Sequence, residues 1–338
     1  MKAWQITQCT GPSGLKCVDI PNPKPGFGEV LVRIKAVSLN YRDLGATRRE
    51  RPGNLPLPFT ICSDGAGEVV EVGQGVTRWK AGERVLPTFF QDWSAGNMTR
   101  EVMKSALGGA LPGVLAEFAI ARESGLARMP EGLSFEEAAT LPCAGLTAWH
   151  ALIENGGSPL RAGQTVLTLG TGGVSLFALQ FAKLHGARVI ITSSSDEKLA
   201  RAKHLGADET INYKTTPDWE RRVFEITEKR GADHVIELGG AGTLQKSLEA
   251  VCYGGRISLI GVLTGFEGLV NPWPIIARSV SVQGIYVGSR TMFEAMNRAI
   301  GQNGLKPVID RVFPFNEAIA AFEHMAAGRH FGKIVLRV

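Results

Sequence analysis

Apolar and polar residues alternate in two segments of the first third of the chain. The segments are Glu29–Ala36 (EVLVRIKA) and Gly65–Val72 (GAGEVVEV), and their period of two predicts strands with one buried face. A tight turn is predicted at Gly73–Gly75, and another short strand begins with Gly82–Val85. Short strands separated by glycine and proline favour a small β-barrel or sandwich.

From Thr165 onward the pattern changes to apolar strands that alternate with helical segments. The predicted strands are TVLTL, RVIIT, ETINY, HVIEL and RISLIG. The predicted helices between them lie near residues 174–185, 196–205, 216–230 and 243–251. Strands interleaved with helices indicate βαβ units, a parallel sheet and therefore an α/β fold. An amphipathic helix over 316–327 and a strand over Lys333–Val338 end the chain.

Two segments between these regions have a less regular pattern. Residues 90–114 show no clean period and contain four glycines, which predicts a long loop of the kind that often serves function. Ser134 and Glu137 form a capping box, so a helix is predicted to follow toward Thr140 and to be interrupted at Pro142.

The composition is that of a folded chain with an excess of glycine. The 338 residues are 44% hydrophobic and carry a net charge of +5, which excludes a disordered chain and allows roughly two domains. The 41 glycines amount to about 12%, against a typical usage of about 7%. Because no low-complexity tract explains the excess, we expect these glycines at turns and at close backbone approaches.

Cysteine usage and hydropathy predict a cytoplasmic protein. The five cysteines form no C-x-x-C pair, which argues against a disulfide framework and a zinc ribbon; they are Cys9, Cys17, Cys62, Cys143 and Cys252. The N-terminus lacks the apolar core of a signal peptide, and no stretch of about 18 apolar residues occurs. We therefore expect no membrane partner.

Basic residues are dispersed, so we expect no nucleic-acid partner either. The single compact cluster, Arg48–Arg51, contains Glu50 and lies in a proline-rich segment, which favours a solvated loop. The six histidines are isolated, and neither G-x-S-x-G nor H-E-x-x-H occurs. Hydrolase chemistry therefore has no support.

A glycine-rich turn joins the strand TVLTL to the next helix. In Gly170-Thr171-Gly172-Gly173-Val174-Ser175, Gly170 permits the tight turn and Gly172 permits a pyrophosphate to approach the backbone. Ser175 stands where the strict fingerprint has its third glycine, and it is small enough for helix–strand packing. The position between strand and helix predicts dinucleotide binding, and a purely structural turn is the alternative.

The end of the second strand of this series predicts the coenzyme. NAD sites use an acid about 20 residues after the first glycine, but RVIIT is followed by Ser193, Ser194 and Ser195. These serines, backed by Lys198 and Arg201, can bind a 2′-phosphate and so favour NADP(H). In the alternative interpretation, the serines cap the next helix and Lys198 is solvated.

Several segments in the same order resemble the medium-chain dehydrogenase/reductase superfamily over nearly the whole chain. They are GEVLVRIKAVSLNYRD (28–43), DGAGEVVEVGQGVTRWKAGERV (64–85), LPCAGLTAWHAL (141–152), the fingerprint, LGADETINY (205–213) and FGKIVL (331–336). Within the superfamily the sequence is similar to the zinc-free quinone oxidoreductase, or zeta-crystallin-like, branch.

The resemblance implies two domains with the cofactor in the cleft between them. Residues 1–122, completed by 277–338, would form a GroES-like β-barrel catalytic domain. Residues 123–276 would form a Rossmann domain, a doubly wound parallel sheet inserted into the first domain.

The resemblance also implies the absence of metal. Where the zinc-dependent branch has Cys, His and Cys, this chain has Asn40, Ser63 and Cys143. One thiol cannot hold a catalytic zinc, which needs three protein ligands. Segment 90–114, where the structural zinc lobe would lie, contains no cysteine.

The same resemblance implies further cofactor contacts. Lys198 and Tyr213 match residues that bind the 2′-phosphate, Lys333 matches a basic residue near the phosphates, and Thr147 matches a residue against the nicotinamide. Glycines at the ends of later strands, among them Gly239 and Gly261, would leave room for the cofactor.

The predicted chemistry is hydride transfer from NADPH to a quinone or an α,β-unsaturated carbonyl, in a homodimer. Hydroxyl and amide donors would stabilise the developing negative charge, and the candidates are Asn40, Tyr41, Ser63 and Thr147. Tyr41 or water would supply the proton. Asp43 is expected to anchor the loop, and Ser279–Val287 falls where relatives pair edge strands across a dimer. An alcohol or aldehyde dehydrogenase and a non-catalytic NADP(H)-binding protein are the alternatives.

Overall fold

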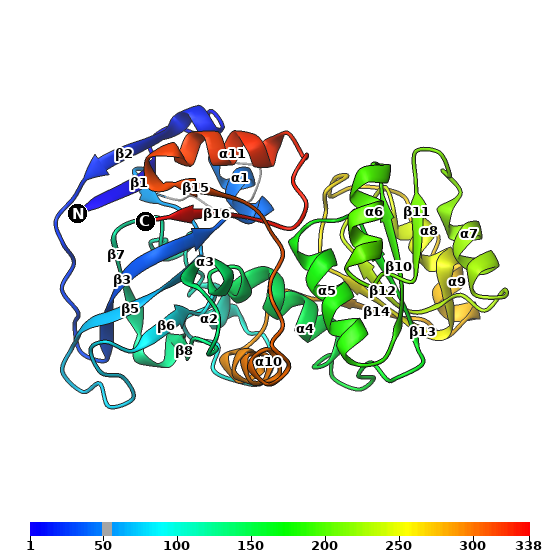
Figure 1. Ribbon diagram of the computed structural model, residues 1–338, viewed down its shortest axis with the longest axis horizontal. Coiled ribbons are helices and arrows are strands. Elements are labelled where there is room, and N and C mark those ends of the chain that lie inside the picture. Colours follow the sequence, from blue (N-terminus) through cyan, green and yellow to red (C-terminus); the bar gives the residue numbers. More distant parts are fainter. Residues whose placement is uncertain (49–55) are drawn as a thin grey trace. The chain divides into compact units, whose positions relative to one another are not determined.

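The computed structural model describes residues 1–48 and 56–338 of the chain (Figure 1). Of the basic cluster noted above, Arg49, Glu50 and Arg51 lie outside the described residues. The chain divides into two compact units, and we describe each by itself. The first contains Met1–Leu146 and Val287–Val338, and the second contains Thr147–Tyr286.

A long central strand organises the first unit. Strand β3 (Glu29–Ser38) pairs antiparallel with β5 (Asp64–Val72) along one edge. Along its other edge it pairs with β7 (Phe118–Arg122) and with β16 (Lys333–Arg337). The last strand of the chain therefore lies beside the third, as expected of a barrel built from both chain ends.

Two sheets make up the barrel of the first unit. The larger has the order β15-β16-β3-β5-β6-β8, and the smaller has the order β2-β1-β4. The strands not yet bounded are β1 (Lys2–Ile6), β2 (Leu15–Asp19), β4 (Phe59–Thr60), β6 (Arg84–Pro87), β8 (Leu126–Arg128) and β15 (Ile309–Pro314). Alternate residues of β3 and β5, such as Val32, Ile34 and Val69, enter its core. The short alternating strands favoured a small barrel or sandwich, and the resemblance implied a GroES-like barrel; the barrel is confirmed.

The first unit contains short helices and one longer helix, α10 (Arg290–Asn303). The short helices are α1 (Tyr41–Thr47), α2 (Arg100–Met103), α3 (Phe135–Ala138) and α11 (Ala318–Ala326). The capping box of α3 is confirmed, because Ser134 Oγ accepts from Glu137 N at 3.2 Å and Glu137 Oε2 accepts from Ser134 N at 2.8 Å. Pro142 lies in the first turn of a π-helical segment, Leu141–Gly145, where its missing N–H costs nothing.

The predicted loop 90–114 contains helix α2 and is held by hydrogen bonds within the segment and to strand β4. Gln91 N donates to Ser105 O at 3.0 Å, and Phe90 forms an isolated bridge with Ala106. Gly113 N donates to Thr60 O at 2.7 Å. The segment is therefore an ordered insertion between strands of the barrel.

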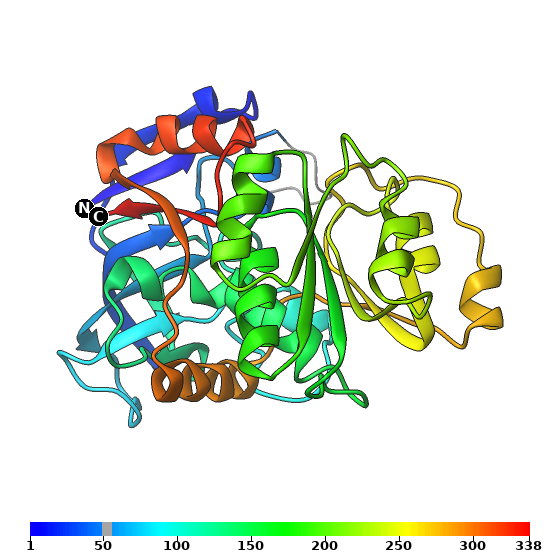
Figure 2. The same cartoon turned by 45° about the vertical axis from the view of Figure 1, so that its right-hand side comes forward.

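The second unit is a parallel six-stranded sheet in the order β11-β10-β9-β12-β13-β14. The strands are β9 (Thr165–Leu169), β10 (Arg188–Ser193), β11 (Glu209–Asn212), β12 (Ala232–Glu237), β13 (Val251–Leu259) and β14 (Ser281–Gly284). Helices α5 (Gly173–Leu184) and α6 (Asp196–His204) lie on one side of the sheet. Helices α7 (Trp219–Ile226), α8 (Leu244–Ala250) and α9 (Trp273–Ala277) lie on the other, as Figures 1 and 2 show. The predicted doubly wound sheet is confirmed.

The junctions between the units lie later in the chain than the expected 122/123 and 276/277. Helix α3 packs on β3, β5 and β16 and so belongs with the barrel. Strand β14 pairs parallel with β13 and so belongs with the second sheet. Helix α4 (Leu146–Leu152) begins at the first junction. Within the described part of the chain, no helix is long and apolar enough to span a membrane.

Candidate functional site

Asn40 lies where β3 ends and α1 begins, and its backbone is fixed on both sides. Asn40 N donates to Asp43 Oδ2 at 2.9 Å, and Asp43 N donates to Asn40 O at 2.9 Å. Asp43 is fully buried. It therefore anchors the turn that presents Asn40, which is the structural role expected from the sequence.

A buried ammonium group fixes the side chain of Asn40. Lys333, the first residue of β16, is only 4% exposed, and the pairing of β16 with β3 brings it beside the end of β3. Its Nζ donates to Leu39 O at 2.6 Å and to Asn40 Oδ1 at 2.5 Å. Because the carboxamide oxygen binds the ammonium group, the other end of the Asn40 side chain is its NH₂ donor.

Asp64 is the buried carboxylate of this cluster. Its Oδ1 accepts from Ser63 Oγ at 2.7 Å, and its Oδ2 accepts from Cys143 N at 3.0 Å. Burial raises the pKa of Asp64, while the charge of Lys333, the Ser63 hydroxyl and the Asn40 amide lower it. The Asn40 amide is near enough to lower the pKa of Asp64, although Asn40 Nδ2 forms no hydrogen bond of regular geometry with any described residue.

Asp43 and Arg42 add a second pair of charges. Burial raises the pKa of Asp43 to about 6, against the opposing effects of Arg42 and the Asn40 N–H. Arg42 donates to Leu107 O at 2.8 Å and to Gly108 O at 2.7 Å, and its guanidinium lies 4.7 Å from the Phe89 ring centroid. Arg42 therefore ties α1 to the loop 90–114 that the sequence left unexplained.

The two thiols near these acids are neutral. Burial raises the pKa of Cys143 to about 12 and raises that of Cys62 well above its usual value. Neither is activated as a nucleophile. Among residues 1–48 and 56–338, no group of three or more His, Cys, Asp or Glu side chains is placed to hold a metal ion.

The structure thus brings together part of the predicted catalytic set. Asn40 and Ser63 meet at Asp64, with the Ser63 hydroxyl proton donated to that carboxylate. Tyr41 is the exposed member, with 47% of its surface accessible. Sequence reasoning missed Asp64 and its bond to Cys143 N. An acid that opens a strand of small and apolar residues is a signal that could have found it.

In the second unit, the glycine-rich turn presents free donors. Gly170 has a φ of 79°, which a residue with a side chain rarely adopts. Gly172, the residue before α5, has no side chain to cap the helix, so the first N–H groups of α5 are available to an anion. Ser175 Oγ donates to Leu169 O at 2.8 Å and ties the helix to the strand. This donor set fits the pyrophosphate of a dinucleotide.

The serine cluster and its neighbours gather at the end of β10. Tyr213 N donates to Ser193 O at 3.1 Å, which places Tyr213 directly beside that strand. Ser195 Oγ accepts from Lys198 N at 3.4 Å and caps α6, so the capping alternative holds for this serine. Ser193 and Ser194 do not cap the helix. The hydroxyl groups at the end of β10, together with Lys198 in the first turn of α6, are donor types that fit a 2′-phosphate.

A buried carboxylate shapes the loop after β12. Glu237 Oε1 accepts from Gly239 N at 2.7 Å, Gly240 N at 3.0 Å and Thr243 Oγ1 at 2.6 Å, and its Oε2 accepts from Ser247 Oγ. A Cβ at Gly261 would lie 2.3 Å from Leu238 O. This glycine is therefore required by packing between two loops of the protein itself. Its predicted contact with the cofactor stays a prediction, as does the role of Thr147 in α4.

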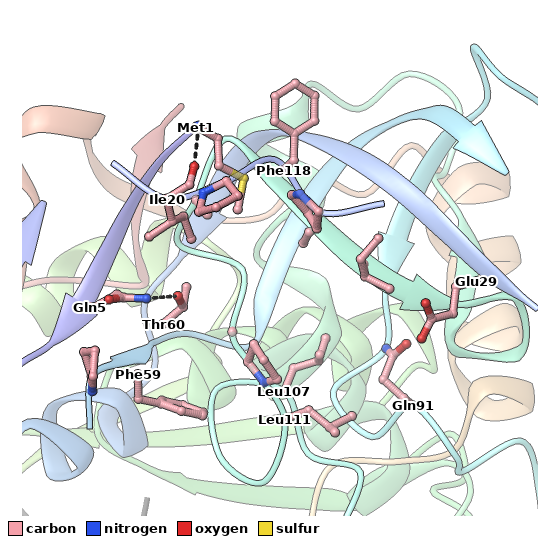
Figure 3. A pocket seen from close by; sticks show the side chains of 18 of the residues that line it. Met1, Gln5, Ile20, Glu29, Phe59, Thr60, Gln91, Leu107, Leu111 and Phe118 are labelled. Carbon is pink, nitrogen blue, oxygen red and sulfur yellow. Dashed lines mark hydrogen bonds between the residues drawn. The ribbon is translucent and has the colours of Figure 1, made fainter. Parts of the chain in front are cut away.

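A separate cavity of about 520 Å³ lies within the first unit (Figure 3). Its walls are mostly apolar and include four prolines, and Gln5 Nε2 donates to Thr60 Oγ1 at 3.3 Å across one side. None of the predicted catalytic or cofactor-binding residues is among those that line it.

Comparisons with known proteins match both parts of the chain. A family model described as an alcohol dehydrogenase GroES-like domain matches residues 26–131, and one described as a zinc-binding dehydrogenase matches residues 173–302. A zinc-type alcohol dehydrogenase-like protein of Schizosaccharomyces pombe is 44% identical over 92% of this chain and 91% of its own. A quinone oxidoreductase of Mus musculus is 30% identical over 99% of this chain and 97% of its own.

Solved structures extend the similarity to the whole fold. A candidate alcohol dehydrogenase from Sinorhizobium meliloti has a TM-score of 0.93 and 45% identity, covering 100% of this chain and 98% of its own. A structure described as an NAD-dependent alcohol dehydrogenase has a TM-score of 0.91 and 37% identity, with both chains covered completely. A mycobacterial protein complexed with NADPH has a TM-score of 0.85 and 30% identity, again over both whole chains.

Proposed function

Because the chain belongs to the medium-chain dehydrogenase/reductase superfamily of oxidoreductases, we propose that it is a zinc-independent, NADPH-dependent reductase of quinones or α,β-unsaturated carbonyls. The observation that carries the proposal is the bond from Lys333 Nζ to Asn40 Oδ1. The position of a metal-binding cysteine in zinc-dependent relatives is occupied here by an amide that binds an ammonium group. This donor set suits a neutral or anionic substrate atom and does not suit a zinc ion.

The residues of the second unit fit a dinucleotide. The N–H groups at the start of α5 would bind the pyrophosphate, and Ser193, Ser194, Lys198 and Tyr213 would bind the 2′-phosphate. When bound, the nicotinamide supplies hydride to an electrophilic carbon of the substrate. Thr147 would pack against it. Lys333 uses two of its three N–H donors within its own unit, which leaves one for a cofactor phosphate.

The residues of the first unit would stabilise the charge that develops on the substrate. Tyr41 is exposed and can donate from Oη, whereas the Ser63 proton is directed at Asp64. We therefore assign the proton to Tyr41 or to water, with Asn40 as an amide donor. Five cysteines without disulfide partners suit a reducing compartment, and we place the activity in the cytoplasm.

Two relatives favour a second candidate, an alcohol dehydrogenase. The S. pombe relative is named a zinc-type alcohol dehydrogenase-like protein, and one solved neighbour is named NAD-dependent. A simple alcohol needs its oxygen polarised, and zinc commonly does this in metal-dependent enzymes. Metal dependence therefore separates the two candidates. The third candidate is a protein that binds NADP(H) but has no enzymatic activity.

The deciding experiment follows NADPH and NADH absorbance with quinones, enones, aldehydes and alcohols, with and without a chelator, alongside metal analysis of the purified chain. We expect NADPH oxidation with quinones or enones only, unaffected by chelation, and no stoichiometric zinc. Oxidation of simple alcohols that is lost on chelation would overturn the proposal. Coenzyme binding without turnover of any substrate would instead support the binding protein.

A further inference from the structure

We infer that Asn212 determines coenzyme selectivity by holding the carboxylate of Asp196 away from the 2′-position of the bound ribose. The inference rests on the proposed binding of a nicotinamide coenzyme and names a residue that controls which coenzyme is preferred. From the sequence we assigned no role to Asn212, and we placed Asp196 only at the start of a predicted helix.

The side chain of Asn212 has a single orientation. Its Oδ1 accepts from Lys214 N at 3.0 Å, and a backbone N–H can only donate. The opposite end of the carboxamide is therefore the NH₂ group, and Nδ2 donates to Asp196 Oδ1 at 2.7 Å. The bond joins the end of β11 to the first residue of α6.

This bond lies among the residues proposed to bind the 2′-phosphate. Ser193 and Asn212 are partners in the parallel pairing of β10 with β11. Tyr213 follows Asn212 directly, and Asp196 precedes Lys198 by two residues in the first turn of α6. The other charged residues of this region are Glu197, Arg201 and Lys214. Asp196 is thus an acid close to residues whose hydroxyl and ammonium groups are proposed to bind the 2′-phosphate.

The charge of Asp196 discriminates between the two coenzymes. A carboxylate repels a 2′-phosphate, whereas it accepts a hydrogen bond from the free 2′-hydroxyl of NAD. Asp196 lies in the first turn of α6, where the helix dipole interacts favourably with a negative charge. The hydrogen bond from Asn212 directs that charge toward β11. Without it, the carboxylate is no longer held toward β11.

The experiment is a double-mutant cycle on the full-length protein. N212L removes the amide and keeps the branching of the side chain at Cγ, D196N removes the charge, and E197Q removes the neighbouring acid as a matched control. Isothermal titration calorimetry with NADP⁺ and NAD⁺ measures each affinity, and thermal unfolding confirms that each variant is folded. We expect N212L to weaken NADP⁺ about three- to tenfold while NAD⁺ is unchanged or bound more tightly. We expect E197Q to leave the ratio of the two affinities within about twofold.

The D196N background decides between selectivity and structure. If Asn212 acts through the acid, N212L changes the NADP⁺/NAD⁺ ratio by less than about twofold once Asp196 is Asn, and 0.5 M salt reduces its effect in the wild-type background. Equal weakening of both coenzymes, or the same ratio change with and without Asp196, overturns the inference. The coupling between positions 196 and 212 is measured as a change in the NADP⁺/NAD⁺ affinity ratio between variants. The ratio in the wild type is a separate measurement, and it tests the proposed preference for NADP⁺.

Discussion

Lys333 Nζ donates a hydrogen bond to Asn40 Oδ1 at 2.5 Å, although 293 positions separate the two residues. The bond connects the last strand of the chain to the turn after β3. Lys333 is almost completely buried, and its charge lowers the pKa of Asp64 in the same cluster. The negative charges of two buried acids, Asp43 and Asp64, are thus compensated beside Asn40 by the positive charges of Arg42 and Lys333.

Replacing this buried lysine is expected to destabilise the protein strongly. K333M keeps the aliphatic volume but leaves Leu39 O and Asn40 Oδ1 without their donor and Asp64 without its compensating charge. Breaking such a buried charge typically costs about 3 kcal/mol of unfolding free energy. Urea denaturation of wild type and K333M measures the change.

An exposed lysine provides the control for K333M. Lys306 is 55% exposed and lies 3.2 Å from Glu137, so K306M is expected to change the unfolding free energy by less than about 1 kcal/mol. If both variants lose the same small amount, the charge of Lys333 is not a structural element of the site.

The titration of Asp43 predicts a specific pH dependence of stability. The carboxyl group titrates near 3.8 in the unfolded chain, and burial raises its pKa to about 6 in the folded protein. Between these values the folded state binds more protons, so stability from this group falls as the pH rises from about 4 to 6. The shift corresponds to roughly 3 kcal/mol.

Comparison with D43N isolates this contribution. The variant keeps an acceptor for Asn40 N but has no titrating group, so its unfolding free energy relative to wild type should rise by about 3 kcal/mol between pH 4 and pH 7. Denaturation at several pH values measures the difference. A difference that is constant across this range would show that the carboxyl group titrates normally.

The sequence predicted the sheets and the glycine-rich turn because their signals are local. Alternation along β3 and β5, and the glycine turn between β9 and α5, depend on residues that are close together in the chain. The cluster around Asp64 could not be predicted in the same way, because Asn40, Cys143 and Lys333 come from distant segments. Their contacts depend on the register of β16 against β3, which no local pattern contains.

The limits of helices show the same dependence on context. Helix α7 was expected over 216–230 but spans Trp219–Ile226, because Glu228 and Lys229 adopt positive φ values. Asp196 was correctly placed at the start of a helix, but its bond to Asn212 required the pairing of β10 with β11. Local propensity thus placed the elements, and strand register determined which side chains meet.

The loop after β12 is expected to depend on the charge of Glu237. E237Q replaces one acceptor oxygen by an NH₂ donor in a site where every partner is itself a donor. We expect a loss of about 2–3 kcal/mol of unfolding free energy and weaker binding of NADPH, measured by denaturation and by coenzyme fluorescence. E249Q is the control, because within the described part of the chain the Glu249 side chain accepts one hydrogen bond, from Gln245 Nε2 at 3.0 Å. Full stability of E237Q would mean that the loop holds its shape without the carboxylate.

An apolar surface on the second unit is the site that we propose for the homodimer expected from the sequence. Strand β14 ends the six-stranded sheet, and the segment just before it exposes large apolar side chains; these are Leu263, Phe266, Leu269, Trp273 and Ile276. An open sheet edge beside such a surface is a typical site of association. A second copy of the chain would extend the sheet from β14 and cover these residues.

We propose that W273E separates the dimer, because burying a carboxylate in an apolar contact is unfavourable without a partner charge. Sedimentation velocity at micromolar concentration should give twice the mass of one chain for wild type and the mass of one chain for W273E. F27E is the matched control, because Phe27 is equally prominent, 80% exposed, but belongs to the first unit. A monomeric wild type would remove the proposal. A dimer that survives W273E but dissociates with F27E would assign the contact to the first unit. The reason is that a new carboxylate is desolvated only where it lies inside the interface.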